Sequence, residues 1–193
     1  MKFILSFLLL SSCFVITNAQ TEQSLPVDEQ GKLIYYEVVN VKTPADSLKI
    51  RVLNYLKKQN KDLKFKSTQG DTAFIATGKM IINKTLLVMS HPSGEVLYDF
   101  QAEVKNGKYR FWLTNFSFIP YQRDRYANFV ASTTVGIPLE NNPGKLNAGE
   151  WKEYKVQTAK YAKDLASKFK FYMSSRTPII ALTTEKKVVK KEW

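Results

Sequence analysis

The residue types that usually carry chemistry are scarce in this sequence of 193 residues. His91 is the only histidine and Cys13 the only cysteine, so the chain can assemble neither a usual zinc site nor a thiol–imidazole pair. His91 precedes a proline, a pairing that favours a turn. Asp124 lies between Arg123 and Arg125. This pattern predicts a local ion cluster, because a calcium or magnesium site needs several oxygen ligands at a short repeat.

The other candidates for catalysis are equally isolated. The Ser-Thr-Thr cluster at 132–134 has no recognisable base beside it, and no glycine-rich phosphate-binding loop occurs. We therefore expect no catalytic residues, no metal and no cofactor. A hydrolase-type enzyme without a recognisable motif remains one alternative.

A long hairpin offers a different kind of chemistry, that of a binding surface. Residues 96–119 alternate apolar and polar side chains on either side of an Asn-Gly pair at 106–107, the preferred pair for a type I′ turn. The turn fixes the register, because a slip of one residue would bury charges. The predicted pairs are Val104 with Tyr109, Ala102 with Phe111, Phe100 with Leu113 and Tyr98 with Asn115 on the core face, and Glu103 with Arg110, Gln101 with Trp112 and Asp99 with Thr114 on the other.

The hairpin face away from the core carries the candidate binding residues. Continued alternation places Trp112, Phe116 and Phe118 on that face, beside Arg110. An exposed aromatic row beside an arginine could hold a peptide, a glycan or a hydrophobic partner such as an envelope protein. The irregular segment 120–148 would then form its rim or lid. The alternative is that this loop folds back and buries the aromatic side chains in a second core.

Periodicity predicts the elements that must position this hairpin. Residues 43–60 favour an amphipathic helix with Thr43 as its N-cap, and residues 150–174 favour a second helix with an aromatic stripe. Gly78 interrupts a β-rich run and indicates a bulge or a close backbone approach. Strands are expected at 32–41, 63–67 and 72–83, and a turn at 91–94.

One α+β domain accounts for most of the chain. The order strand, helix, several strands, helix predicts a single antiparallel sheet with two helices packed on one face, and a hydrophobic content of 44% suffices for its core. We divide the chain into a signal peptide (1–19), a lead-in (20–31), the domain (32–175, including the loop 120–148 and the helix 150–174) and a basic tail (176–193).

The amino terminus predicts export. Residues 1–19 combine Lys2, a short apolar run and small residues before Gln20, the pattern of a secretory signal peptide, and the run is too short for a transmembrane span. We expect cleavage between Ala19 and Gln20 and a secreted or periplasmic protein. The alternative is a lipobox ending at Cys13, which would anchor the mature chain through a lipid.

The charge balance permits a second class of partner. The chain carries a net charge of +12, which would suit nucleic acid or another anionic polymer. The lysines are scattered between apolar positions, however, as on an ordinary solvated surface. Asp99 and Glu103 share the candidate face with Arg110 and would repel phosphate. We therefore keep a polyanion binder as an alternative and expect nucleic acid not to be a partner.

One stretch carries a family resemblance. Pro26, Asp28 and Gly31 form a Pro-x-Asp-x-x-Gly lead-in, followed by a strand ending in Val-Val and an amphipathic helix. Residues 25–118 thereby resemble the secreted Bacteroidota family named domain of unknown function 4468. A Trp-Leu pair is expected late in the helix, where this chain has Tyr55-Leu56.

The resemblance implies a TBP-like (TATA-binding-protein-like) fold and an envelope location. It brings no known activity and therefore no catalytic residues to carry over. Together with the residues themselves, it favours a non-enzymatic, cofactor-free binding module, whose ligand the sequence does not identify.

Overall fold

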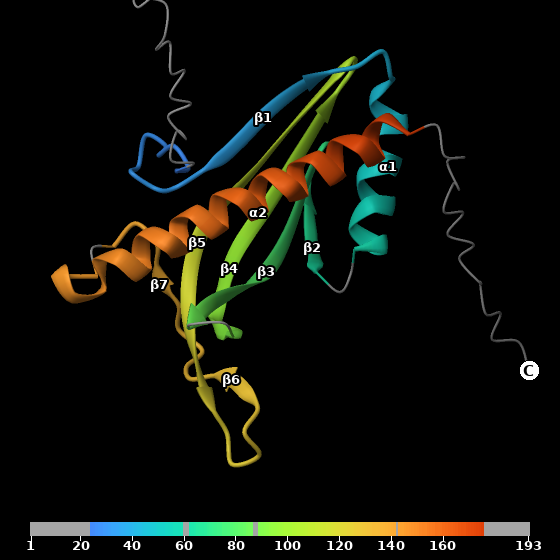
Figure 1. Cartoon of the computed structure of the whole chain (residues 1–193). Coiled ribbons are helices and arrows are strands. Elements are labelled where there is room, and N and C mark those ends of the chain that lie inside the picture. Colours follow the sequence, from blue (N-terminus) through green and yellow to red (C-terminus); the bar gives the residue numbers. More distant parts are fainter. Residues whose placement is uncertain (1–23, 60–61, 87–88, 142, 176–193) are drawn as a thin grey trace, which may run out of the picture.

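One antiparallel sheet, covered on one face by two helices, is the framework of the molecule (Figure 1). Its strands follow the order β1-β5-β4-β3-β2, and the short strands β6 and β7 pair with the later part of β5. The helix α2 lies across the sheet, and α1 packs beside it on the same face (Figure 1). The predicted α+β architecture is therefore confirmed.

The computed structural model describes residues 24–59, 62–86, 89–141 and 143–175. None of the described helices is both long and apolar enough to cross a membrane. The elements are β1 (Tyr35–Asn40), α1 (Ala45–Lys58), β2 (Leu63–Gln69), β3 (Ala73–Leu86), β4 (Met89–Lys105), β5 (Lys108–Arg123), β6 (Phe129–Ala131), β7 (Ile137–Pro138), a 3₁₀ turn (Lys145–Asn147) and α2 (Ala148–Ser174).

The lead-in before β1 is an ordered turn. Asp28 Oδ1 accepts hydrogen bonds from the backbone N–H groups of Gln30 and Lys32, both at 2.9 Å, and Gly31 supplies the positive φ of 75° that the turn needs. These contacts give a physical reason for the Asp and the Gly of the lead-in motif. The turn also brings Leu25 into the core, at 8% exposed. The predicted signal peptide and basic tail lie outside the described residues.

The Asn-Gly turn between β4 and β5 also caps the first helix. The backbone N–H of Ala45 donates to Asn106 Oδ1 at 2.9 Å. The prediction of Thr43 as N-cap is wrong, because Pro44 occupies the N-cap position without a side-chain cap bond. A distant side chain satisfies the free N–H, so the helix start does not need the neighbouring threonine.

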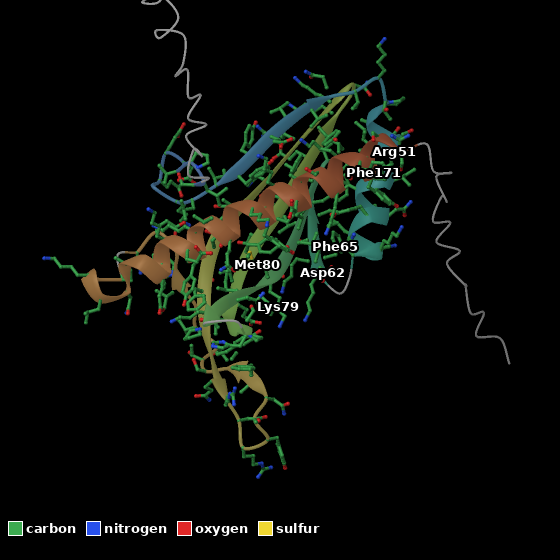
Figure 2. The ribbon with its side chains drawn as sticks, viewed as in Figure 1. Arg51, Asp62, Phe65, Lys79, Met80 and Phe171 are labelled. Carbon is green, nitrogen blue, oxygen red and sulfur yellow. The ribbon has the colours of Figure 1, made fainter. Side chains whose placement is uncertain are left out.

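A half-buried arginine joins the two helices. The Arg51 guanidinium of α1 donates from Nη1 to the carbonyl oxygen of Met173, near the end of α2, at 2.6 Å (Figure 2). Tyr55 of α1 also meets Phe169 of α2 edge to face, with ring centroids 5.0 Å apart. These contacts place both helices over the apolar face of the β4–β5 hairpin. The predicted register of this hairpin is confirmed from the pair Val104–Tyr109 to the pair Asp99–Thr114.

Beyond Thr114 the predicted register is wrong. Asp99 pairs with Thr114, but Leu97 pairs with Ser117, so two residues of β5 lie opposite one residue of β4. This is a β-bulge, and Asn115 adopts a positive φ of 55° within it. Because one residue is inserted, the side chains that follow exchange faces of the sheet.

The segment 120–148 is more regular than predicted. β5 continues to Arg123 and pairs with β6, while β7 pairs with Ser117 and Phe118 on the edge of β5. Leu139 is then fully buried, and its carbonyl oxygen accepts a hydrogen bond from Trp151 Nε1 at 3.0 Å. The segment therefore runs along the sheet edge towards α2.

Two further local predictions differ from the structure. The turn predicted at 91–94 is wrong, because these residues lie inside β4 and pair with β3 or β5. The close approach at Gly78 is made by a side chain, whereas a bulge or a close backbone approach was predicted. A Cβ atom there would lie 2.3 Å from a ring carbon of Tyr98, so only glycine leaves room for this ring.

Candidate ligand-binding face

The face of the sheet opposite the helices, here named the open face, carries the candidate site. β1 and β5 place Tyr36 beside Trp112 and Val38 beside Arg110, two alternate pairs of the ladder that share this face. Tyr36 is 48% and Val38 51% exposed. These four residues, here named the aromatic platform, come from strands that are fixed on their other face by the core.

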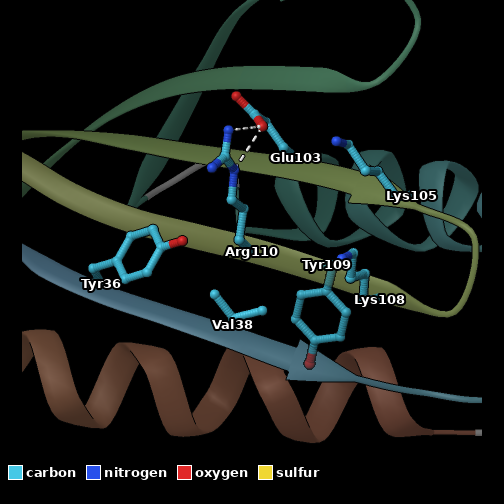
Figure 3. Close-up of a pocket in the computed structure, with 7 residues that line it drawn as sticks. All are labelled: Tyr36, Val38, Glu103, Lys105, Lys108, Tyr109 and Arg110. Carbon is cyan, nitrogen blue, oxygen red and sulfur yellow. Dashed lines mark hydrogen bonds and ion pairs between the residues drawn. The ribbon is translucent and has the colours of Figure 1, made fainter.

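The aromatic platform is held together by its own contacts. The Tyr36 and Trp112 ring centroids lie 6.4 Å apart at 38°, and the Arg110 guanidinium lies 5.6 Å from the Trp112 ring, within cation–π range. A cavity of about 160 Å³ adjoins the platform near the hairpin end, lined in part by Tyr36, Val38 and Arg110 (Figure 3). The sequence prediction that Arg110 and Trp112 share this face is confirmed.

The arginine of the platform is already paired. Arg110 donates from Nε at 2.7 Å to Glu103 Oε2, which also lies 2.6 Å from Nη2 (Figure 3). The hydrogen bond to Glu103, followed by one to Tyr36, raises the pKa of Arg110 above its ordinary value. The charge is thus compensated within the site. This arrangement suits stacking and hydrogen bonding better than capture of a phosphate.

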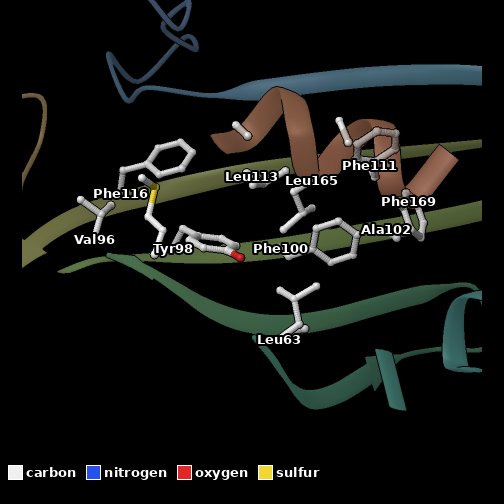
Figure 4. Close-up of a cluster of buried hydrophobic side chains, with 14 of the residues drawn as sticks. Leu63, Val96, Tyr98, Phe100, Ala102, Phe111, Leu113, Phe116, Leu165 and Phe169 are labelled. Carbon is white, nitrogen blue, oxygen red and sulfur yellow. The ribbon is translucent and has the colours of Figure 1, made fainter. Parts of the chain in front are cut away.

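Phe116 and Phe118 do not belong to this face, and their placement there is wrong. Phe116 is fully buried and Phe118 is 5% exposed. Phe118 stacks on Tyr154 of α2 with centroids 4.4 Å apart, and Phe116 lies in the core beside Tyr98 (Figure 4). The bulge at Asn115 reverses their orientation and brings them under α2.

The sequence does contain a signal for this reversal. Buried apolar residues occupy odd positions from Tyr109 to Leu113 and then even positions at Phe116 and Phe118. The shift in phase falls at Asn115, a residue type that tolerates positive φ. The alternation is therefore compatible with a bulge at this point, although it does not by itself decide which face the later aromatic residues occupy.

Sequence reasoning also missed a second hollow on the open face, here named the central groove. It has a volume of about 550 Å³ and crosses β2, β3, β4 and β5 next to the aromatic platform. Its lining is mainly polar and includes Lys64, Lys66, Thr77, Asp99, Asn115 and Ser117. No short motif marks it, because its residues come from four separate strands.

The bulge residue organises one wall of the central groove. Asn115 Nδ2 donates to Asp99 Oδ2 at 2.7 Å, and Asn115 Oδ1 accepts from Lys32 Nζ at 2.9 Å. The side chain of Lys32, which precedes β1, is thereby linked through β5 to β4. The chain of bonds fixes the orientation of the Asp99 carboxylate.

A buried carboxylate closes the far end of the open face. Glu95 is only 8% exposed, and its Oε2 accepts from Lys79 Nζ at 2.9 Å and from the Tyr121 hydroxyl at 2.8 Å. Burial, followed by the bond to Glu95, raises the pKa of Tyr121 to about 12. The charge of Glu95 is therefore paired within the fold.

The residues first considered for chemistry have structural partners. The His91 ring stacks on Phe129 at 5.7 Å, so it belongs to the β4–β6 contact. The predicted ion cluster at Asp124 is wrong: its Oδ1 accepts the backbone N–H groups of Tyr126 and Asn128, both at 2.8 Å. The bond to Asn128 is the main reason why the pKa of Asp124 is lowered. Within the described ranges, no group of three or more His, Cys, Asp or Glu could hold a metal.

The strand order, with two helices on one face, defines an α+β protein of TBP-like fold. Residues 35–119 match the model of a family described as a domain of unknown function (DUF4468) with TBP-like fold. This match covers β1 to most of β5 and supports the resemblance drawn from the first strand and the helix, whereas the lead-in motif lies before the matched residues.

Two solved structures have a similar fold. One is a DUF4468 family protein from Bacteroides ovatus, with a TM-score of 0.57 and 12% identity over 80% of this chain and 92% of that one. The other is a TBP-like protein from Parabacteroides distasonis, with a TM-score of 0.57 and 12% identity over 77% of this chain and 96% of that one. No curated protein matches the chain. At this identity the likeness establishes the fold alone.

Proposed function

We propose that this protein is a non-enzymatic binding module of the bacterial cell envelope that engages its ligand with the open face. The aromatic platform carries the proposal. Its tyrosine and valine are about half exposed (48% and 51%) although the sheet that carries them packs its other face into the core. A rigid aromatic pair binds at low conformational cost, because its rings are already held in place. The ligand classes considered are a peptide, a glycan and an envelope protein.

The arrangement of the polar groups supports binding over catalysis. The one charged side chain of the platform, Arg110, is paired with Glu103 beside it, and the single histidine is stacked on Phe129. A general base needs a free position beside a substrate. An enzymatic activity that the protein loses when one polar residue of the open face is substituted would overturn this proposal.

Export is the second part of the proposal and rests on residues 1–19. Mass spectrometry of the mature protein from its native host should give Gln20, or its cyclised form, as the amino terminus. A diacyl- or triacyl-modified Cys13 would show instead that the chain is lipid-anchored.

Binding to an anionic polymer is the competing class, and the net charge of +12 favours it. The dependence of the binding affinity on salt concentration distinguishes the polyanion binder from the aromatic binding module. Affinity carried by lysine contacts to a polyanion falls steeply from low to physiological ionic strength, whereas affinity carried by aromatic docking changes little.

The platform is tested by titrating the full chain with panels of peptides and oligosaccharides while following backbone amide NMR signals. Ligand shifts should map to β1 and β5, and Trp112→Ala or Tyr36→Ala should weaken binding by about tenfold or more. Phe171→Ala is the matched control, because Phe171 is 77% exposed on α2, in the opposite layer (Figure 2). Equal loss in all three variants, or no loss in any, would contradict the proposal.

A further inference from the structure

We propose that the ligand of the open face is a hydroxyl-rich chain, an oligosaccharide, and that the central groove binds its hydroxyl groups. This inference rests on the proposed binding function and specifies its ligand. It also assigns a role to residues of β2, β3 and β4 that the aromatic platform does not use.

The groove presents hydrogen-bonding groups of both kinds. Lys64 and Lys66 donate, and the Asp99 carboxylate accepts. Thr77, Asn115 and Ser117 can do both. A sugar hydroxyl also donates and accepts at once, so it can pair with each of these groups. Such a mixed array fits a neutral polyol better than a ligand of one charge.

The bulge provides a second, independent observation. Asn115 adopts a positive φ of 55°, a conformation that asparagine tolerates better than most residues other than glycine. Bulges often re-aim a side chain at a functional site, and this one directs the Asn115 amide onto Asp99 Oδ2. Within the described part of the chain, no hydrogen bond reaches Asp99 Oδ1. That oxygen is therefore oriented and available to accept from a ligand hydroxyl.

Other ligand classes fit the groove less well. A polyanion would meet Asp62 and Asp99 in the same lining that holds the lysines. A peptide that adds as a strand needs an open sheet edge. Of the strands that the groove crosses, β3, β4 and β5 are paired on both sides, and only β2 is an edge strand. The groove therefore offers mainly side-chain contacts, which suit a chain of hydroxyl groups.

The groove and the aromatic platform lie on the same face, a short distance apart along β5. Asp99 pairs with Thr114, two residues along β5 from Trp112, which corresponds to roughly 7 Å along the strand. Lys64 on β2 lies three strand spacings from β5, which corresponds to a further distance of about 14 Å across the sheet. A chain of several sugar rings can therefore place one apolar ring face on Trp112 while its hydroxyls reach the groove.

The test uses the full chain and defined probes. Maltohexaose, cellohexaose, xylohexaose and chitohexaose serve as neutral oligosaccharides, with trigalacturonate and an extended Ser/Thr-rich peptide for comparison. Calorimetry gives the affinity, and amide NMR shifts locate the site. We expect at least one neutral oligosaccharide to shift signals of Thr77, Leu97 and Asn115.

Two variants remove the groove contacts with little risk to folding. Asp99→Asn keeps the side-chain shape, and Asn115→Gly keeps a residue that accepts positive φ. Each should weaken binding of the neutral oligosaccharide by about tenfold or more, because a hydrogen bond involving a charged or oriented group is lost. Asp164→Asn on α2 is the matched control and should leave the affinity unchanged; circular dichroism verifies folding of all three.

Three results would overturn the inference: no neutral oligosaccharide binds, only trigalacturonate or the peptide binds, or both groove variants retain full affinity. These results differ from failure of the proposed function. A peptide whose binding is lost in Trp112→Ala but not in the groove variants would support the platform and refute the oligosaccharide. Oligosaccharide binding that depends on Asn115 but not on Trp112 would support the groove and refute the platform.

Discussion

The two parts of β5 on either side of Asn115 follow opposite rules. From Lys108 to Thr114 the odd-numbered residues face the core, whereas Phe116 and Phe118 face it afterwards. The first part pairs with β1 and the later part with β7. One inserted residue therefore divides a continuous strand into a segment that presents Trp112 outward and a segment that packs its phenylalanines under α2.

This difference shows how far along a hairpin the turn determines the register of the two strands. The Asn-Gly pair determines the pairing only while the ladder remains uninterrupted, here as far as Asp99 with Thr114. Beyond that point, burial of apolar side chains beneath α2 overrides simple alternation. Burying two phenylalanines stabilises the fold by far more free energy than one asparagine at positive φ costs.

Core substitutions give the largest expected effect. Phe111→Ala before the bulge and Phe116→Ala after it should each lower the free energy of unfolding by about 3–5 kcal/mol, because each leaves a cavity in the core. Trp112→Ala should cost clearly less, since its side chain lies on the open face. Urea denaturation measures all three. If Phe116→Ala were as mild as Trp112→Ala, the reversed orientation after Asn115 would be wrong.

The close approach at Gly78 should give the next largest effect. A Cβ atom at this position would lie 2.3 Å from the Tyr98 ring, so Gly78→Ala should cost about 1–3 kcal/mol through overpacking. Gly149→Ala in the first turn of α2 is the control, because no heavy atom lies within 4 Å of its added carbon. Chemical denaturation should find the control neutral or slightly stabilised. Equal effects would mean that the Tyr98 ring moves aside freely.

The bulge itself can be tested by comparing two substitutions at one position. Asn115→Ala and Asn115→Gly remove the same hydrogen bonds to Lys32 and Asp99, but only alanine is strained at a φ of 55°. The alanine variant should therefore be less stable than the glycine variant by about 1–2 kcal/mol. Thermal melts of the two proteins give the difference. Identical stabilities would argue against the left-handed backbone at the bulge.

A rise to alkaline pH should have the smallest effect on the stability of the fold. It tests two tyrosines near opposite ends of β5. Burial is the main cause that raises the pKa of Tyr109 to about 12 and of Tyr121 to about 12. An unfolded tyrosine loses its proton near 10. The folded state thus keeps protons that the unfolded state releases. Its stability should be complete below about pH 10 and decline as the pH rises from about 10 to about 12.

Urea unfolding at about pH 9 and about pH 11 measures this decline. Tyr109→Phe and Tyr121→Phe should each make the loss of stability with pH shallower, because one titrating phenol is removed. An unchanged pH dependence in both variants would show that other groups control alkaline unfolding.

Local sequence patterns predicted the parts of this molecule that depend on near neighbours. The Asn-Gly turn, both amphipathic helices and the α+β class follow from side-chain period and turn chemistry, which act over a few residues. The outward position of Trp112 follows from the same register. The helix cap was missed because the group that supplies it, Asn106, is distant in the sequence.

The candidate site was only half predictable for the same reason. Trp112 and Arg110 were placed correctly because they precede the bulge, whereas Phe116 and Phe118 were not. The segment 120–148 was expected to be irregular, whereas β6 and β7 pair with β5 and Leu139 is fully buried. Such long-range contacts leave no periodic trace in the segment. Its role as a rim or lid stays a prediction.

By itself, the sequence determined the fold class, the register of the hairpin near its turn and the outward face of Trp112, since each depends on short-range periodicity and backbone preference. Only the tertiary structure decided the rest. It assigned Phe116 to the core through the bulge at Asn115, and it gathered Lys64, Thr77 and Asp99 from three strands into one groove. These features arise where separate strands meet, because pairing and burial are settled among residues that are distant along the chain.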